Sequence, residues 1–300
     1  MSPISLAGRV LLAALFLLPL AACDETSGFD ADVALIVDDA RAARQSGDLA
    51  RAVTLLEGAH ERQPDDAEVR VELATTLLQR DGLDLMDLDR IGRFLSETAG
   101  TETPESAQGA SSARQGDYCA LADDPSAQPF DPTSVAGFDA LAAHAATLAR
   151  TADLLAPVIP DALQSFDVCT SVADGALAYD RDAALAELAG QGLTEAQVAQ
   201  ALAVNALARF LDAYLFVAER LPQQTTWYRR ADGTIVICVE DEAALRADAE
   251  QAIRGVGQAV LSLDARAALV GSGSLAAEIV AVALDAYQEL RSAVPDYCQI

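Results

Sequence analysis

The stretch from Val33 to Gln79, VALIVDDARAARQSGDLARAVTLLEGAHERQPDDAEVRVELATTLLQ, decides the fold of this chain. Its apolar residues recur at helical spacing in three successive segments, which turns at Gln45–Asp48 and Pro64–Asp66 separate. Small residues stand where neighbouring helices have to approach closely: Ala40, Ala43, Ala52 and Ala59. The stretch therefore predicts consecutive helices that pack in antiparallel pairs.

Residue by residue, this stretch resembles the tetratricopeptide repeat, which is a helix pair of about 34 residues. In the unit Val33–Asp66, Gly47 matches the turn between the helices and Pro64 matches the end of the unit. The packing positions are matched in the second helix by Ala52, Leu56 and Ala59, and in the next unit by Leu73, Ala74 and Leu77. The second helix of that next unit, around 86–97, lacks the small residues. The resemblance covers one unit and the first half of another.

Repeats of this family bind partners on a concave face, which the first helix of each unit lines. The resemblance therefore implies partner contacts at seven residues: Val37, Arg41, Arg44, Gln45, Val71, Thr75 and Gln79. Arg41 and Arg44 are neighbours on one helix face, so their guanidinium groups could capture a carboxylate or an acidic segment. This interpretation predicts that reversing both charges abolishes partner binding and leaves the melting temperature nearly unchanged. Alternatively, the two arginines pair at the surface with Asp38, Asp39 or Asp48, at under ~1 kcal/mol.

The N-terminal segment has the features of a signal that directs export. Arg9 precedes an apolar run from Val10 to Leu20 that is too short to span a bilayer, as in cleaved signal peptides. The end of the run, LAAC at 20–23, resembles the lipobox of bacterial lipoproteins, in which the cysteine becomes the lipidated first residue. The resemblance implies a protein of the bacterial cell envelope, anchored through Cys23 and facing the periplasm. Asp24 resembles an inner-membrane retention signal of some bacteria, so the choice between inner and outer membrane stays open.

Composition shifts divide the chain into five segments. A cleaved signal at 1–22 and a lipidated tether at 23–30 precede the helical repeat at 31–98, a linker rich in Gly, Ser and Pro at 99–133, and a C-terminal domain at 134–300. The last domain is Ala-rich and reads as helical, except for a β-hairpin at 225–239, where two strand patterns flank Asp232-Gly233. The sequence thus predicts a mainly α fold.

The longest apolar helix of the C-terminal domain is expected from Thr194 to Leu221. Thr194 and Gln197 have the spacing of a capping box, and Pro222 follows the helix. Because polar residues interrupt the apolar pattern, we expect a buried core helix rather than a membrane span.

Four cysteines remain after the lipobox, and an even number in an exported protein predicts two disulfide bonds. They are Cys119, Cys169, Cys238 and Cys298. The pairing Cys119–Cys169 with Cys238–Cys298 closes the shorter loops and is favoured among three possibilities. A zinc site is the rival interpretation, but no two of these cysteines are close in sequence and the chain has 2 histidines. The sequence therefore predicts no metal site.

The charge balance limits the partners of this chain. It has 46 acidic residues against 20 basic ones, all arginine, for a net charge of −26. Such a surface repels nucleic acids and anionic lipid headgroups. No motif predicts a catalytic residue or a cofactor, so the first interpretation is a non-enzymatic, membrane-anchored scaffold for another envelope protein or peptide. Two alternatives stay open. A closed apolar cavity in the C-terminal helices would favour a ligand-binding accessory lipoprotein of a transport system, and two carboxylates in a deep cleft would favour an envelope hydrolase.

Overall fold

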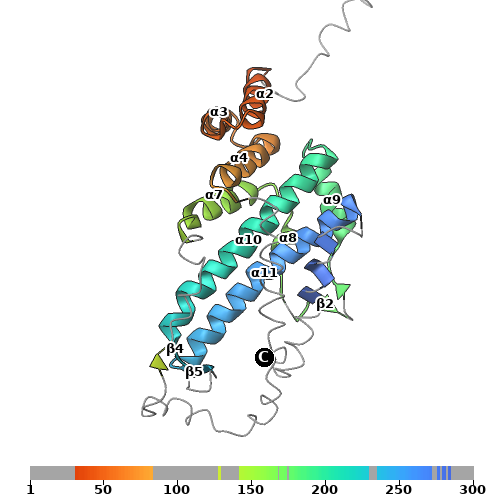
Figure 1. Ribbon diagram of the computed structural model, residues 1–300. Helices are drawn as coiled ribbons and strands as arrows, with labels where there is room; N and C mark the ends of the chain where they lie inside the picture. The colour runs from red at the N-terminus through yellow and green to blue at the C-terminus, as the bar shows by residue number, and fades with distance from the viewer. Residues whose placement is uncertain are drawn as a thin grey trace, which may run out of the picture.

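The computed structural model describes residues 31–83, 128–129, 142–167, 169–173, 176–229, 235–271, 276–277, 279–281 and 283–284 (Figure 1). The fold is mainly α, which confirms the predicted class. The expected signal at 1–22, the tether with Cys23, the helix around 86–97 and nearly all of the linker at 99–133 lie outside the described residues.

Three helices form the N-terminal stack: α2 (Ala31–Gln45), α3 (Leu49–Arg62) and α4 (Ala67–Arg80). Their boundaries follow local chemistry. Gly47, at φ 83°, takes the left-handed conformation that lets the chain reverse between α2 and α3. Asp48 then caps α3 by accepting a hydrogen bond from the Arg51 backbone at 3.2 Å, and Asp66 caps α4 in the same way at 3.1 Å.

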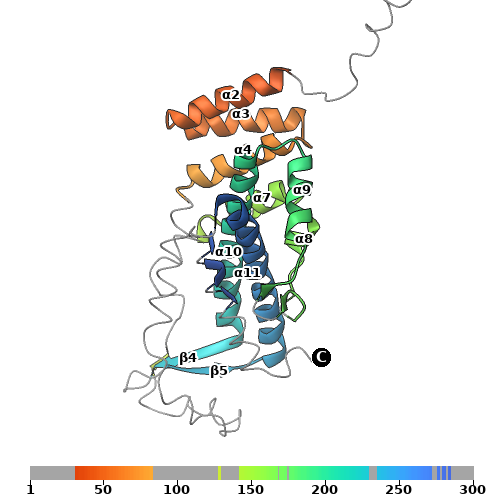
Figure 2. The ribbon, with the colours of Figure 1, turned by 90° about the vertical axis from the view of Figure 1, so that its right-hand side faces the viewer.

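Helix α7 (Ala145–Leu155) packs against α4 in the opposite direction. At one end, the Thr147 hydroxyl donates to the carboxylate of Asp81, which follows α4. At the other end, Arg70 of α4 donates to the Leu154 carbonyl at 3.4 Å. Helix α7 thus takes the place of the second helix in the second pair, as the stack in Figure 2 shows. The sequence assigned this helix to the C-terminal domain.

The junction between α4 and α7 makes stability depend on pH. Burial opposes ionisation of Asp81, but hydrogen bonds from Arg80 and Thr147 outweigh it and lower the pKa of the carboxyl. A carboxyl with a lowered folded pKa stabilises the fold above its unfolded pKa of about 3.9, and this contribution is lost as the pH falls through the folded pKa.

We therefore expect Asp81→Asn to flatten the acid side of the stability profile. Between pH 5 and pH 2, wild-type protein should lose more of its melting temperature than the variant does, because the variant lacks this ionisation. Thermal unfolding followed by circular dichroism measures both profiles. Asp65→Asn is the matched control, because the Asp65 side chain is 99% exposed. Parallel profiles for wild type and Asp81→Asn would contradict the expectation.

Two long antiparallel helices form the body of the C-terminal part: α10 (Glu195–Gln224) and α11 (Glu242–Val270). The predicted capping box is present at the start of α10, where the Gln197 backbone donates to the Thr194 hydroxyl at 3.3 Å and Gln197 Oε1 accepts from the Thr194 backbone at 2.8 Å. Between the two helices, Asn205 donates to the Ser262 hydroxyl at 2.9 Å. Small and aliphatic side chains fill the rest of this interface.

Helix α10 is long and apolar enough to cross a bilayer, and it is the one such helix among the described residues. In this structure 65% of its most apolar stretch is buried, and the helix packs against α4, α7 and α11. Its environment here is that of a core helix.

A short sheet connects α10 with α11. Strands β4 (Thr225–Arg229) and β5 (Ile235–Val239) pair antiparallel at the position of the predicted hairpin, with Trp227 opposite Ile237. Strand β1 (Gln128–Pro129), which the sequence placed in the linker, adds a third strand beside β4.

Between α7 and α10, the chain forms α8 (Asp161–Gln164), α9 (Arg181–Gly190) and a second small ribbon of β2 (Val172–Ala173) and β3 (Ala176–Leu177). The sequence analysis did not predict this second ribbon. The ribbon has two residues in each strand, which is too short to show an alternating pattern in the sequence.

Candidate functional site: a groove between the helix stack and α10

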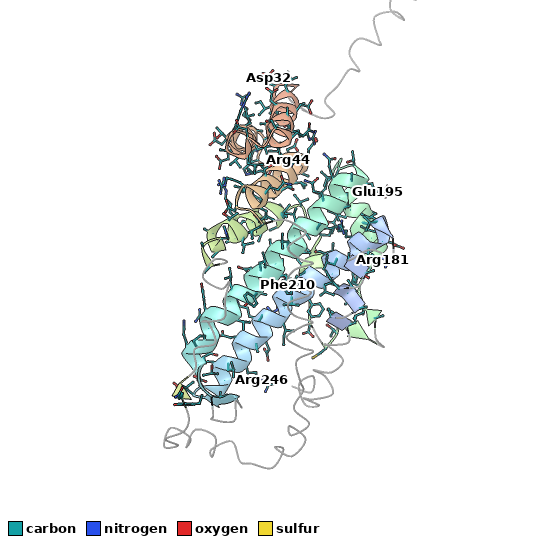
Figure 3. The ribbon with its side chains drawn as sticks, viewed as in Figure 1. Asp32, Arg44, Arg181, Glu195, Phe210 and Arg246 are labelled. Atoms are coloured by element: carbon teal, nitrogen blue, oxygen red, sulfur yellow. The ribbon has the colours of Figure 1, made fainter. Side chains whose placement is uncertain are left out.

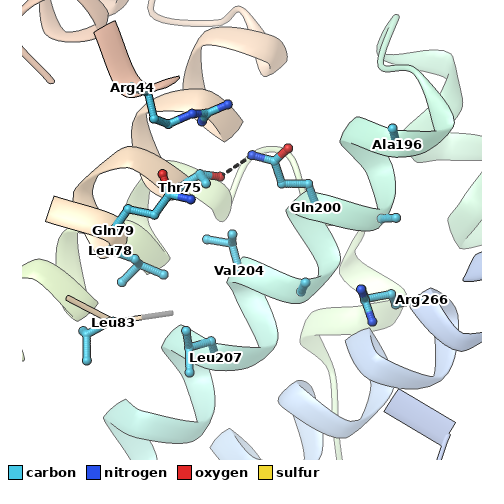
Figure 4. A pocket seen from close by; sticks show the side chains of 12 residues that line it. Arg44, Thr75, Leu78, Gln79, Leu83, Ala196, Gln200, Val204, Leu207 and Arg266 are labelled. Carbon is cyan, nitrogen blue, oxygen red and sulfur yellow. Dashed lines mark hydrogen bonds between the residues drawn. The ribbon is translucent and has the colours of Figure 1, made fainter. Parts of the chain in front are cut away.

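A cavity of about 480 Å³ opens between α4 and α10 (Figure 4). Leu78 and Leu83 come from α4 and the residues after it, and Val204 and Leu207 come from α10. Further small side chains of α10 complete an apolar floor, which we call the α4–α10 groove. Figure 3 places Arg44 of α2 at the junction between the helix stack and the beginning of α10.

Polar groups lie along the groove in positions that suit hydrogen bonding. Gln200 of α10 donates to the Thr75 hydroxyl of α4 at 2.7 Å, and this hydroxyl in turn donates to the Val71 carbonyl at 2.8 Å. Gln79 is exposed at the end of α4 and lines the groove without a hydrogen bond to other described residues. The amide of Gln79 and the carbonyl oxygen of the Gln200 side chain are therefore available to a ligand.

The charge of the lining differs from that of the chain. The 12 described residues that line the groove include two arginines, Arg44 and Arg266, and no acidic residue. The whole chain has 46 acidic residues among 300. The groove is therefore a cationic, largely apolar surface in an acidic protein, which makes it a candidate site for an anionic ligand.

At the α2 side of the groove, two arginines and two glutamates form a closed network. Glu72, whose side chain is 5% exposed, accepts from Arg41 Nε at 2.8 Å and from Arg44 at 2.6 Å. Glu68 accepts from Arg41 and from Gln197 of α10, the latter at 2.7 Å. These contacts join α2, α4 and α10. The four side chains carry two positive and two negative charges, which offset one another.

The network corrects the expectation for Arg41 and Arg44. Their main partners are Glu68 and Glu72 of α4. Of the three aspartates expected as local partners, Arg41 contacts Asp38 at 3.4 Å. Reversing both charges would place four carboxylates together: those of Glu68 and Glu72, and one at each of positions 41 and 44. The hydrogen bonds that join α2 to α4 here would be lost. The melting temperature should therefore fall in that double variant, contrary to the prediction from the sequence.

The seven residues expected to contact a partner divide into three groups. Val37 and Val71 are 3% and 0% exposed in the core, so their side chains do not reach a partner. Gln45 is exposed at the end of α2, and Arg41 is held in the network. Arg44, Thr75 and Gln79 do come together in the groove. The physical reason for the change is that α10 packs against α4, on the face that an isolated repeat would leave open.

Arg266 of α11 is the main residue of the groove that the sequence did not indicate. It is partly buried, and its Nε atom is buried without a hydrogen-bond partner. It has no hydrogen bond or ion pair among the described residues. Arg266 lies 187 positions after Gln79 in the chain, so no local pattern could have placed the two in one site.

A second cavity of about 520 Å³ lies beside α9 and α11. Tyr179 donates to Asp264 at 2.7 Å, and Arg181 lies 3.6 Å from the same carboxylate. Burial and the hydrogen bond to Asp264 raise the pKa of Tyr179, so the phenol stays protonated. Asp180, also in the lining, caps α9 through the Ala183 backbone at 3.0 Å. These carboxylates are engaged in holding the fold.

Cys169 is in a disulfide bond. The cysteine with which it pairs lies outside the described residues, which include neither Cys119 nor Cys298 nor the side chain of Cys238. Among the described residues, no three His, Cys, Asp or Glu side chains come together as they would to hold a metal ion.

No family model, curated protein or solved structure matches the chain.

Proposed function

We propose that the chain is a membrane-anchored envelope lipoprotein that acts as a scaffold and binds a segment of another envelope protein or peptide in the α4–α10 groove. The observation that carries the proposal is the lining of that groove: a floor of Leu, Val and Ala side chains with amide, hydroxyl and guanidinium groups at its edges. Peptide-binding grooves combine these two features, because the partner brings both a polar backbone and apolar side chains.

The groove offers each part of a peptide a suitable contact. Gln79 and Gln200 can exchange hydrogen bonds with backbone N–H and C=O groups, while Leu78, Val204 and Leu207 can contact aliphatic side chains. The volume of about 480 Å³ accommodates a few residues rather than a domain. The partner therefore presents a short segment.

The N-terminal sequence supports the location. The LAAC stretch at 20–23 resembles a lipobox, and acylation of Cys23 would hold the helix stack at the membrane surface on the periplasmic side. The helix stack resembles a repeat family whose members assemble proteins, which fits a scaffold role.

A small carboxylate is the second candidate ligand, and such a ligand would make the chain a ligand-binding accessory lipoprotein of a transport system. The observation that favours it is the cavity volume, which falls in the range of about 300–1,000 Å³ typical of small-molecule sites. A hydrolase is not supported at this site, because none of the described residues that line the groove carries a carboxylate.

In-cell photocrosslinking tests the scaffold role. A benzophenone amino acid in place of Gln79, in the full chain, should give one discrete adduct with an envelope protein in the membrane fraction. The same probe at Ala186, which is exposed on α9 outside the groove, is the matched control and should not give this adduct.

A second substitution shows whether the adduct forms through the groove. Ala199→Trp, which places an indole in the lining, should remove the Gln79 adduct, while Ala186→Trp should keep it. An adduct that survives Ala199→Trp, or that forms equally from position 186, would move the docking surface elsewhere. Recovery of the chain in the soluble fraction alone would contradict the anchor.

A further inference from the structure

We infer that Arg266 binds an acidic side chain of the partner segment, and that aliphatic residues flank this acidic residue. The inference rests on the proposed function, because it names the feature that the α4–α10 groove recognises. Three observations lead to it: the missing partner of Arg266, the charge balance around it, and the apolar surface beside it.

Arg266 has no carboxylate partner among the described residues, although the chain is rich in carboxylates. Acidic residues outnumber arginines by 46 to 20, so an arginine has many carboxylates to pair with. Of the partly buried arginines among the described residues, Arg41, Arg44 and Arg70 each lie within 4 Å of a carboxylate, whereas Arg209 and Arg266 do not, and of these two only Arg266 lines the groove. Arg266 lies in the groove with no such contact, and its buried Nε donates to no acceptor among the described residues. A guanidinium that is partly removed from water and left unpaired is poised for an external carboxylate.

The charge balance identifies Arg266, and not Arg44, as the available cation. Arg44 is bonded to Glu72 at 2.6 Å, and the network of which both are members carries no net charge. Among the described residues, no carboxylate lines the groove near Arg266. The residual charge of the groove is therefore one positive charge at Arg266, which matches one carboxylate of a ligand.

The surroundings of Arg266 define the rest of the ligand. Figure 4 shows Arg266 of α11 across the α10 ribbon from Arg44, and Val204 and Leu207 of α10 line the same groove. A carboxylate at Arg266 thus has apolar surface next to it, which suits aliphatic neighbours. Because Gln79 and Gln200 are placed to bond a continuous backbone, the carboxylate belongs to an acidic side chain rather than to a chain end.

Peptide pools of defined composition test the preference of the groove directly. All peptides have eight residues, with random Ala, Val and Leu around one fixed central residue. Pool E has central Glu and blocked ends, pool Q has central Gln and blocked ends, and pool C has central Gln and a free C-terminal carboxylate. Each pool is passed over immobilised, purified full-length protein in detergent, and retention is measured by mass spectrometry.

Wild-type protein should retain pool E about tenfold more than pool Q, because a bidentate guanidinium–carboxylate pair replaces a neutral contact. Arg266→Gln should reduce this ratio to below about twofold, and Arg266→Lys should keep part of it. Arg254→Gln is the matched control: it removes an exposed arginine of the same helix, about 18 Å away by helical rise, and should leave the ratio unchanged. Arg266→Gln should not lower the melting temperature, since no bond within the described residues is lost.

Each contrary result has a defined meaning. Equal retention of pools E and Q by wild-type protein, or the same preference in Arg266→Gln, overturns the assignment of Arg266. Preferential retention of pool C overturns the choice of a side-chain carboxylate. If either occurs while the Gln79 adduct still forms through the groove, the inference fails and the scaffold proposal stands. If no pool is retained and no adduct forms, both fail.

Discussion

Replacement of Glu72 by alanine is expected to lower the free energy of unfolding by about 2 to 3 kcal/mol. The Glu72 side chain is 5% exposed and receives hydrogen bonds from two arginines, at 2.8 and 2.6 Å. Removing one member of a buried ion pair typically costs about 3–5 kcal/mol, because the remaining charge is left without compensation. Arg41 and Arg44 are 31% and 22% exposed, so both can turn partly toward water and reduce that cost.

Thermal and urea unfolding measure the effect, and the melting temperature should fall on the order of 5–10 °C. Asp38→Ala is the matched control. Asp38 contacts the same Arg41 at 3.4 Å, but its side chain is 72% exposed, so the loss should stay below ~1 kcal/mol. If the two variants have equal stability, Glu72 is a surface partner in solution and the network does not hold α2 to α4.

The same network shows where sequence reasoning succeeds and where it ends. The helices α2, α3 and α4 were predictable because local signals set their ends: Gly47 in the turn, and Asp48 and Asp66 as caps. The partners of Arg41 could not be predicted in this way. Pairing with nearby aspartates was the natural expectation from spacing, but Glu68 and Glu72, some thirty residues on, become neighbours only when α4 packs beside α2.

The groove likewise has residues that could be predicted from the sequence and residues that could not. Three of its residues were predicted from the repeat resemblance: Arg44 in α2, and Thr75 and Gln79, which are four positions apart on one face of α4. The opposite wall depends on α10 and α11, whose position relative to α4 is set by packing across more than a hundred residues of chain. Arg44, Thr75 and Gln79 line the groove together, and α10 packs against α4 beside them. Only the folded structure places Arg266 in the groove and makes it a candidate binding residue.

Replacement of Gly257 by alanine is expected to destabilise the protein by about 1–3 kcal/mol, although alanine favours helices more than glycine does. Gly257 is buried in α11, where the ring of Phe166 lies directly against it. A methyl group at this position would lie 2.0 Å from Phe166 Cδ1 and 2.1 Å from Cγ. Atoms cannot approach so closely, so the ring would have to leave a site in which it is 4% exposed.

Gly58→Ala is the matched control, since Gly58 lies within α3 and a methyl group there would meet no atom within 4 Å. That variant should gain about 0.5–1 kcal/mol through helix propensity, so the two identical substitutions should shift stability in opposite directions. Urea unfolding of both variants measures the signs.

A double-mutant cycle with Phe166→Leu tests the cause. If the ring is responsible, Gly257→Ala should cost less in the Phe166→Leu background than in wild type, because the smaller side chain leaves space for the methyl group. The cost in both backgrounds would be the same if the alanine acted through the α11 backbone instead. A Gly257→Ala variant as stable as wild type would show that Phe166 does not rest on α11 in solution.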